Sequence, residues 1–175
     1  MNTKQLPVDF PEVQGAIYGV ALSLDALLLN GIQYGVLQRA VFNGFLQKTA
    51  DNLLRDLASL EEQAPHAPAT SQPQVSKALA ALRAKCQQLI HLVTGLTSFR
   101  TLPLEQVRST VRQIPILREA CVQLLQELEG CFRVPKPFYQ SRPSHSTATV
   151  NDFLTNLERA FAEEWGAAGE YRLPS

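Results

Sequence analysis

The chain has 175 residues, with a hydrophobic content of 45% and an aromatic content of 7%. These values exclude a chain that is disordered throughout, and they fit one domain over residues 1–175 that buries a real core. Sixteen basic and sixteen acidic side chains leave no net charge, which excludes a protein that is strongly basic or acidic as a whole.

The first predicted helix runs from about Pro11 to Leu29. Asp9 and Glu12 have the spacing of a capping box, and Pro11 stands in the first turn, where its missing N–H is not needed. We expect Asn30–Gly31 to end this helix, because Asn and Gly tolerate the left-handed conformation of a helix C-terminus.

The stretch from Val13 to Ile32 is apolar enough to raise the question of a membrane span. It contains Asp25 near its middle, and a charge at the centre of a bilayer costs about 2.5–3.5 kcal/mol on insertion scales. No basic segment precedes it, as a signal peptide requires. We therefore expect a buried helix and no membrane contact.

The second predicted helix runs from about Ile32 to Gln63. Its apolar residues cover a wide arc at first and narrow to one stripe later, which predicts burial on several sides and then on one. Gly15/Gly19 and Gly31/Gly35 are each four residues apart, a spacing that either allows two helix backbones to approach closely or has no packing role. A Pro-rich linker over about 64–73 follows.

The third and fourth predicted helices run from about Gln74 to Phe99 and onward from Pro103. The steps between their apolar residues alternate between four and three, as in a coiled-coil seam. These predicted seams are Val75, Leu79, Leu82, Cys86, Leu89, Val93 and Leu96, and Val107, Val111, Ile114, Arg118, Cys121, Leu125 and Leu128. The short turn between them predicts an antiparallel hairpin.

A second linker, over about 133–148, contains three prolines and precedes a fifth predicted helix that ends near Ala168. No segment shows the alternation of a β-strand. The predicted fold is therefore all-α: an elongated bundle of about five helices, built from two antiparallel hairpins and a C-terminal helix.

Charge is distributed unevenly along the chain. Residues 64–118 carry seven basic side chains and one acidic one, a local charge of +6, whereas residues 1–63 and 149–175 each carry −3. A local basic surface attracts polyanions or an acidic partner whatever the overall charge. The predicted contact residues on the basic hairpin are Arg83, Lys85, Arg100, Arg108 and Arg112.

Arg118 occupies a seam position where an apolar residue is expected. An arginine at a seam position can bury its aliphatic part and extend its guanidinium to solvent, pair with a buried acid, or contact a ligand. We favour a pair with a carboxylate of the first two helices, for example Asp25, over a ligand contact.

The second linker interleaves basic and aromatic side chains. That combination suits base stacking and phosphate contact, and it equally suits a connecting strap whose aromatic rings pack onto the bundle, which we favour. The linker residues concerned are Arg133, Lys136, Phe138, Tyr139 and Arg142.

The sequence contains no recognisable catalytic or metal-binding motif. Its histidines lack HxxxH or ExxH spacing, and no CxxC occurs. Cys86 and Cys121 lie on the two core seams, so we interpret them as small buried apolar residues. They are within about one helical turn of each other, which allows a redox pair, but we do not favour that interpretation. We expect a cytoplasmic protein that is not an enzyme and needs no cofactor or metal.

The all-helical pattern and the basic hairpin together predict a non-catalytic subunit of a larger assembly that contacts nucleic-acid backbone without reading sequence. In architecture the chain is similar to the small helical subunits of RNA-guided CRISPR effector complexes. That resemblance implies a short all-α chain without catalytic residues, placed along a nucleic-acid path among other protein subunits. The alternative is a protein–protein adaptor or regulator that binds an acidic or helical partner.

Overall fold

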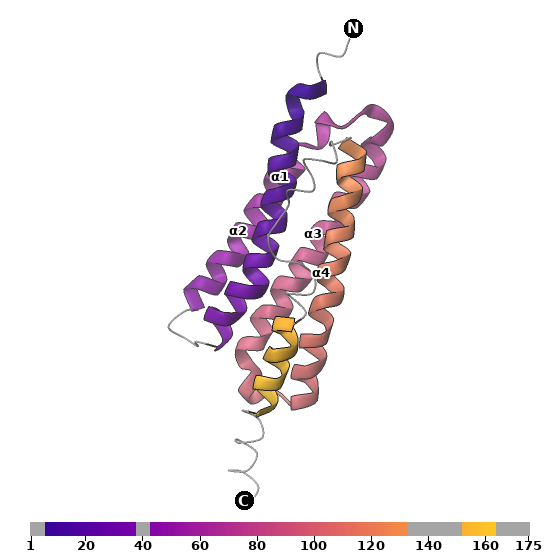
Figure 1. Cartoon of the computed structure of the whole chain (residues 1–175). Helices are drawn as coiled ribbons and strands as arrows, with labels where there is room; N and C mark the ends of the chain where they lie inside the picture. Colours follow the sequence, from indigo (N-terminus) through magenta and orange to yellow (C-terminus); the bar gives the residue numbers. More distant parts are fainter. Residues whose placement is uncertain (1–5, 38–42, 133–151, 164–175) are drawn as a thin grey trace, which may run out of the picture.

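The computed structural model describes residues 6–37, 43–132 and 152–163, and the regular structure of these residues is helical, without a strand. Four long helices, α1 (Leu6–Ala26), α2 (Asn43–Glu61), α3 (Gln72–Gly95) and α4 (Leu104–Phe132), lie roughly side by side in an elongated bundle (Figure 1). A shorter helix follows over residues 152–163. The predicted all-α bundle of about five helices is thus confirmed.

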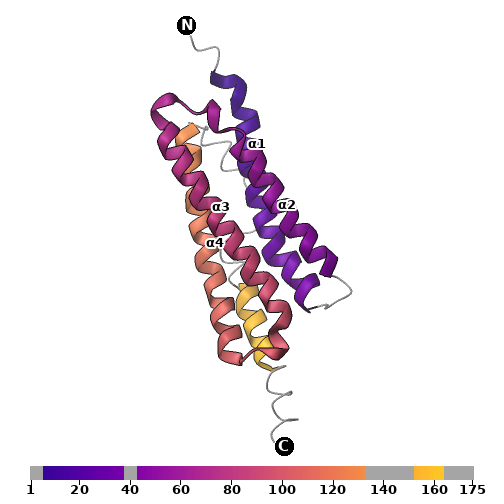
Figure 2. The same cartoon turned by 180° about the vertical axis from the view of Figure 1, so that it is seen from behind.

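The helices follow each other up and down the bundle. α1 packs against α2 and α4, and α3 packs against the same two helices, so the four enclose one core. The 152–163 helix lies near the end of the bundle that holds the α3–α4 turn (Figure 2). Because short connections force antiparallel neighbours, this arrangement follows from the connection lengths.

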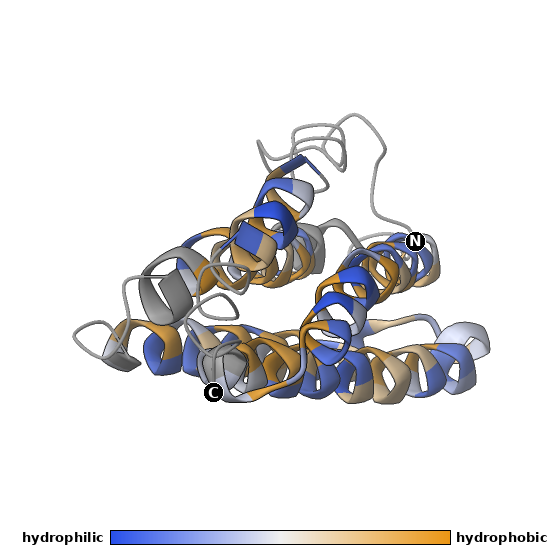
Figure 3. Cartoon of the chain, turned by 90° about the horizontal axis from the view of Figure 1, so that it is seen from below, coloured by the Kyte–Doolittle hydropathy of each residue, from blue (hydrophilic) through white to orange (hydrophobic). Residues whose placement is uncertain are grey.

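The two predicted seams form the centre of this core. All fourteen seam residues, Arg118 included, are buried, and Leu82, Leu89 and Ile114 have no exposed surface. Hydrophobic and hydrophilic residues alternate along the helices (Figure 3), as amphipathic helices require. Burial of each large aliphatic side chain stabilises the fold by about 1.5–3 kcal/mol relative to exposure.

The expected end of the first helix at Asn30–Gly31 is wrong. α1 continues without a break into a π-helical segment, η2 (Leu27–Leu37), and α2 begins at Asn43 rather than at Ile32. Gly31 does not adopt the left-handed conformation. A Cβ atom there would lie 2.9 Å from Thr49 Oγ1 and 3.2 Å from Leu46 Cδ1, so the missing side chain allows α2 to approach closely. An Asn-Gly pair is also common where a helix ends, and for this reason the sequence indicated the wrong role for Gly31.

Gly15 and Gly19 differ from Gly31, and the surroundings of Gly35 lie outside the described part of the structure. A Cβ at Gly19 would make ordinary contact with Asp56 of α2, at 3.7 Å, and a Cβ at Gly15 would meet nothing within 4 Å. The close-approach interpretation therefore holds for Gly31, and Gly15 faces open space on the outside of α1.

The α2–α3 connection is short and held by side-chain hydrogen bonds. Two 3₁₀ turns, η4 (Ala64–His66) and η5 (Ala69–Ser71), lead into α3. Gln72 Nε2 donates hydrogen bonds to the carbonyl oxygens of Ala64, at 3.0 Å, and of Ala67, at 2.8 Å. The Ala64 carbonyl also accepts the backbone N–H of Ala67, at 3.1 Å, so the Gln72 amide adds a second hydrogen bond there and ties the turn to the start of α3. At the opposite end of α3, a 3₁₀ segment, η6 (Leu96–Thr101), turns the chain into α4.

The segment Glu12–Ile32 is the single described stretch that is long and apolar enough to cross a membrane, with a mean hydropathy of 1.5. Core helices of bundles satisfy the same criterion. In this fold 44% of that segment is buried within the bundle.

Candidate functional site

A buried ion pair joins α1 to α4. Arg118 Nε donates to Asp25 Oδ1 at 3.1 Å, and the two side chains are 7% and 3% exposed. The predicted pairing of the seam arginine with a carboxylate of the first helix is therefore confirmed. The two residues are 93 positions apart in the sequence and belong to different helices. Their contact therefore fixes the position of α1 along the axis of α4.

A second ion pair joins α2 to α3. Arg83 donates from Nε and Nη2 to the two carboxylate oxygens of Glu61, both at 2.7 Å. The hydrogen bond to Glu61 raises the pKa of the Arg83 guanidinium above its ordinary value. Bidentate geometry of this kind is stronger than a single contact, so Arg83 is held against Glu61 rather than left for a ligand.

A third ion pair joins α4 to the 152–163 helix. Arg112 Nη2 lies 2.8 Å from Glu158 Oε2, but this oxygen accepts no aligned hydrogen bond. The Arg112 side chain is 66% exposed, and the Glu158 side chain is 22% exposed. An exposed pair with poor alignment contributes little, about 0–1 kcal/mol.

The three pairs explain much of the uneven charge along the chain. In each pair the arginine belongs to the basic stretch 64–118 and the acid belongs to one of the acidic flanks. Opposite charges that are distant in sequence are thus brought together by the fold. Part of the local charge of +6 is neutralised inside the molecule and is not presented to a partner.

Two other predicted contact residues, Lys85 and Arg108, and a further basic residue, Lys77, lie at different heights along the hairpin. Lys77 is exposed, Lys85 and Arg108 are half-buried, and none of the three has an ion-pair partner among the described residues. Lys77 and Lys85 are eight residues apart on α3, about 12 Å along its axis. Arg108 lies near the other end of the hairpin. The side chain of Arg100 and the linker residues Arg133, Lys136, Phe138, Tyr139 and Arg142 lie outside the described part of the chain.

Cys86 and Cys121 meet across the α3–α4 seam, as their positions predict. Both are fully buried free thiols, and the Cys86 thiol donates a hydrogen bond to Cys121. This bond, together with burial, raises the pKa of Cys86 far above its ordinary value. The same bond lowers the pKa of Cys121, and the positive charges of Lys85 and Arg118 add to the effect against the opposing influence of burial.

Among the described residues, no third metal-binding side chain lies with these two thiols. Within the described ranges, no group of three or more His, Cys, Asp or Glu side chains is placed to hold a metal ion. A buried pair of sulfur atoms packs as a small apolar unit, so we assign Cys86 and Cys121 to the core.

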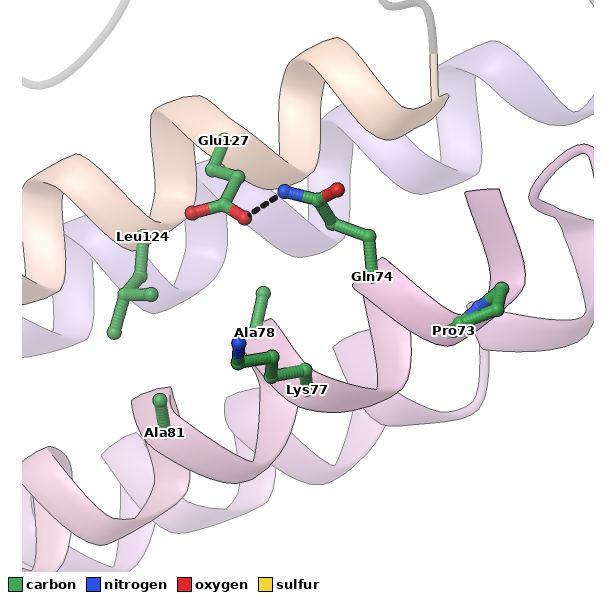
Figure 4. Close-up of a pocket in the computed structure, with 7 residues that line it drawn as sticks. All are labelled: Pro73, Gln74, Lys77, Ala78, Ala81, Leu124 and Glu127. Atoms are coloured by element: carbon green, nitrogen blue, oxygen red, sulfur yellow. Dashed lines mark hydrogen bonds between the residues drawn. The ribbon is translucent and has the colours of Figure 1, made fainter. Parts of the chain in front are cut away.

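A half-open groove of about 410 Å³ lies between the start of α3 and the last turns of α4 (Figure 4). Gln74 Nε2 donates a hydrogen bond to Glu127 across it. The side chains that line the groove are Pro73, Gln74, Lys77, Ala78, Ala81, Leu124 and Glu127. These side chains include no nucleophile with a neighbouring base, so the groove lacks the parts of a hydrolytic or transfer site.

The outer face of α1 carries two large exposed apolar side chains one helical turn apart, Tyr18 and Leu22, each 40% accessible, beside Gly15. The charged Glu12 is exposed at the start of the same helix. α2 and α4 each expose one large apolar side chain, Phe45 and Ile116, among exposed charged residues.

The sequence explains why α1 exposes little charge of its own after Glu12. Between Val13 and Ile32 the one charged residue is Asp25, and its carboxylate is buried against Arg118. Large exposed apolar side chains on an otherwise charged surface are typical of interaction sites. We take the face formed by Gly15, Tyr18 and Leu22, here named the α1 face, as the candidate functional site.

Sequence reasoning did not identify the α1 face. The uncharged run was interpreted as a fully buried helix, and the absence of charge does not distinguish a covered face from an exposed one. The spacing of these residues could have indicated the face. Successive residues of the α1 face are three or four positions apart, so they share one side of a helix: Gly15, Tyr18 and Leu22.

Comparison of the chain with models of protein families, with curated proteins and with solved structures finds no match to any of them.

Proposed function

We propose that the chain is a non-catalytic subunit of a larger protein assembly, and that an uncharged, apolar helix of a partner docks onto the α1 face. The exposed pair of Tyr18 and Leu22 supports this function: among the described residues, α1 exposes two large apolar side chains one turn apart, whereas α2 and α4 each expose one, Phe45 and Ile116.

The chemistry of the face selects the partner. A charged helix docked there would lose hydration, and the charges that the face offers lie at its edges, at Glu12 and at Asp56 beside Gly19. An uncharged helix loses little and gains the burial of Tyr18 and Leu22. Apolar burial of this kind contributes about 25 cal/mol for each Å² removed from water.

Site-specific photo-cross-linking in the native host tests this function. A photoreactive amino acid in place of Tyr18 should give a discrete adduct, and the same amino acid at Gln87, which is exposed on α3, should not. The Leu22→Lys variant should reduce the Tyr18 adduct at least tenfold, whereas Gln87→Lys should leave it unchanged. Equal labelling from both positions, or none from Tyr18, would contradict a dedicated α1 interface.

We propose nucleic-acid contact through the α3–α4 hairpin as a second candidate function. Lys77, Lys85 and Arg108 carry charges that no described acid neutralises, and such charges bind a phosphate backbone without reading sequence. Their wide spacing predicts weak binding.

The affinity of the chain for labelled RNA and DNA, measured at about 50 and 200 mM salt, tests this second function. Each phosphate contact contributes about −0.7 to −0.9 to the slope of log affinity against log salt concentration. The triple variant Lys77→Glu/Lys85→Glu/Arg108→Glu should abolish a slope of about −2 to −3. The matched variant Lys48→Glu/Arg55→Glu, on α2, should retain most of it. An equal loss in both variants, or no binding by the unaltered chain at low salt, rules out a hairpin site.

A further inference from the structure

The groove between α3 and α4 has an apolar floor. Ala78 and Ala81 of α3 and Leu124 of α4 form its middle, and the two small side chains leave it hollow (Figure 4). The apolar row continues along α4, because Leu124, Ala120 and Ile116 follow each other at four-residue steps and share one side of the helix. Ile116 is 70% exposed, more than any other large apolar side chain in the described part of the chain. An apolar strip therefore leads from the groove along the outside of the hairpin.

The α3 edge of this strip is basic. Lys77 lines the groove, and Lys85 stands on the same side of α3, four residues after Ala81. The hydrogen bond from Cys86 lowers the pKa of the Cys121 thiol and the charge of Lys85 adds to this effect, so the Lys85 side chain lies toward α4. Neither lysine has an ion-pair partner among the described residues, and α3 contains no acidic residue. The edge thus carries two positive charges about 12 Å apart along the helix axis.

The negative charge of the groove is confined to one end. Glu127 accepts a hydrogen bond from Gln74 across the groove, at the side of Lys77 that faces away from Lys85 (Figure 4). Acidic groups of a ligand are therefore attracted along the α3 edge and repelled at the Gln74–Glu127 end. This distribution of charge selects an acidic ligand and gives it a direction along the groove.

An amphipathic helix matches both the apolar strip and the basic edge. Its apolar side chains repeat every three or four residues, as do Ile116, Ala120 and Leu124. Two carboxylates seven or eight residues apart on such a helix have the spacing of Lys77 and Lys85. A nucleic-acid backbone matches the lysines alone, because its phosphates gain nothing from an apolar floor.

We propose that the α3–α4 groove binds an acidic amphipathic helix of a partner protein, with its apolar side chains on the floor and its carboxylates at Lys77 and Lys85. The groove contains no residue of α1, so this inference goes beyond docking at the α1 face and does not rest on it. The two lysines are shared with the proposed nucleic-acid contact, and the experiment below distinguishes the two ligands.

Two synthetic helical peptides of about 18 residues, about 27 Å long, serve as probes. Both carry the same row of leucines, flanked by glutamates in one peptide and by lysines in the other. Fluorescence anisotropy with the full chain should show that the glutamate peptide binds at least tenfold more tightly. In the Lys77→Glu/Lys85→Glu variant this preference should reverse, and such a gain of binding requires a folded groove. The matched variant Lys48→Glu/Arg55→Glu, on α2, should keep the original preference.

A second pair of variants tests the floor of the groove. Ala81→Trp fills the groove and should weaken binding of the glutamate peptide at least tenfold. Gln87→Trp places the same side chain at an exposed position on another side of α3 and should leave binding unchanged. Circular dichroism should confirm that both variants keep the helical content of the unaltered chain.

Three results would overturn this inference. The first is equal affinity for the two peptides, or a preference that survives in the Lys77→Glu/Lys85→Glu variant. The second is an equal loss of binding in Ala81→Trp and Gln87→Trp. The third is labelled single-stranded RNA that binds through the two lysines while neither peptide binds, which assigns them to nucleic acid. The cross-link at Tyr18 reports on a different surface, so this inference and docking at the α1 face fail separately.

Discussion

Replacing Arg118 with methionine should lower the free energy of unfolding by about 3–5 kcal/mol, one of the largest effects expected of a single substitution in this chain. Arg118 Nε contacts Asp25 Oδ1 at 3.1 Å, and both side chains are more than nine-tenths buried. The substitution removes the cation that Asp25 contacts from a site that water reaches poorly. Urea denaturation followed by circular dichroism measures the loss.

The double variant Asp25→Val/Arg118→Met is the matched control. Removing both charges together should restore stability to within about 1 kcal/mol of the unaltered chain, because apolar residues of similar volume replace a buried pair at little cost. If the double variant is as unstable as the sum of the two single variants, the pair is not coupled, and the loss in Arg118→Met reflects packing of the arginine side chain alone.

Substitution of Gly31 by alanine should lower the free energy of unfolding by about 1–3 kcal/mol. The new Cβ atom would lie 2.9 Å from Thr49 Oγ1, 3.2 Å from Leu46 Cδ1 and 3.3 Å from Leu27 Cδ1. Thr49 has little freedom to move, because it is buried and its hydroxyl donates a 2.8 Å hydrogen bond to the carbonyl of Leu46. The contact between η2 and α2 must therefore open.

Gly15→Ala provides a control with the opposite sign. No atom lies within 4 Å of the added methyl group, so the greater helix propensity of alanine should stabilise the chain by about 0.5–1 kcal/mol. Thermal or urea unfolding of the two variants in parallel measures the difference. Destabilisation of similar size at both glycines would show that close packing at Gly31 does not decide the outcome.

The features that the sequence predicted correctly are those that depend on local spacing. The alternating steps of four and three place Val75 through Leu96 and Val107 through Leu128 on one side of each helix, and a helix with such a stripe must bury it. A pair between Arg118 and a carboxylate of the first two helices, for example Asp25, was also predicted, because a charge at a buried seam position needs a partner.

The end of the first helix was not predictable in the same way. Asn30–Gly31 satisfies a helix-ending pattern, and the physical reason for Gly31 is the approach of Thr49 and Leu46 from another helix. A glycine that is required by a neighbour in space and a glycine that ends a helix look identical in one sequence.

Sequence alone determined the helical class of this protein, the hairpin of α3 and α4 and the composition of their core, because each depends on residues within a few turns of one another. Tertiary structure decided which charges are neutralised, since Arg83 meets Glu61 and Arg112 meets Glu158 only when separate helices pack together. It also decided which side of helix α1 is left uncovered. Both properties depend on distances between helices, and these are set by the packing of the whole bundle.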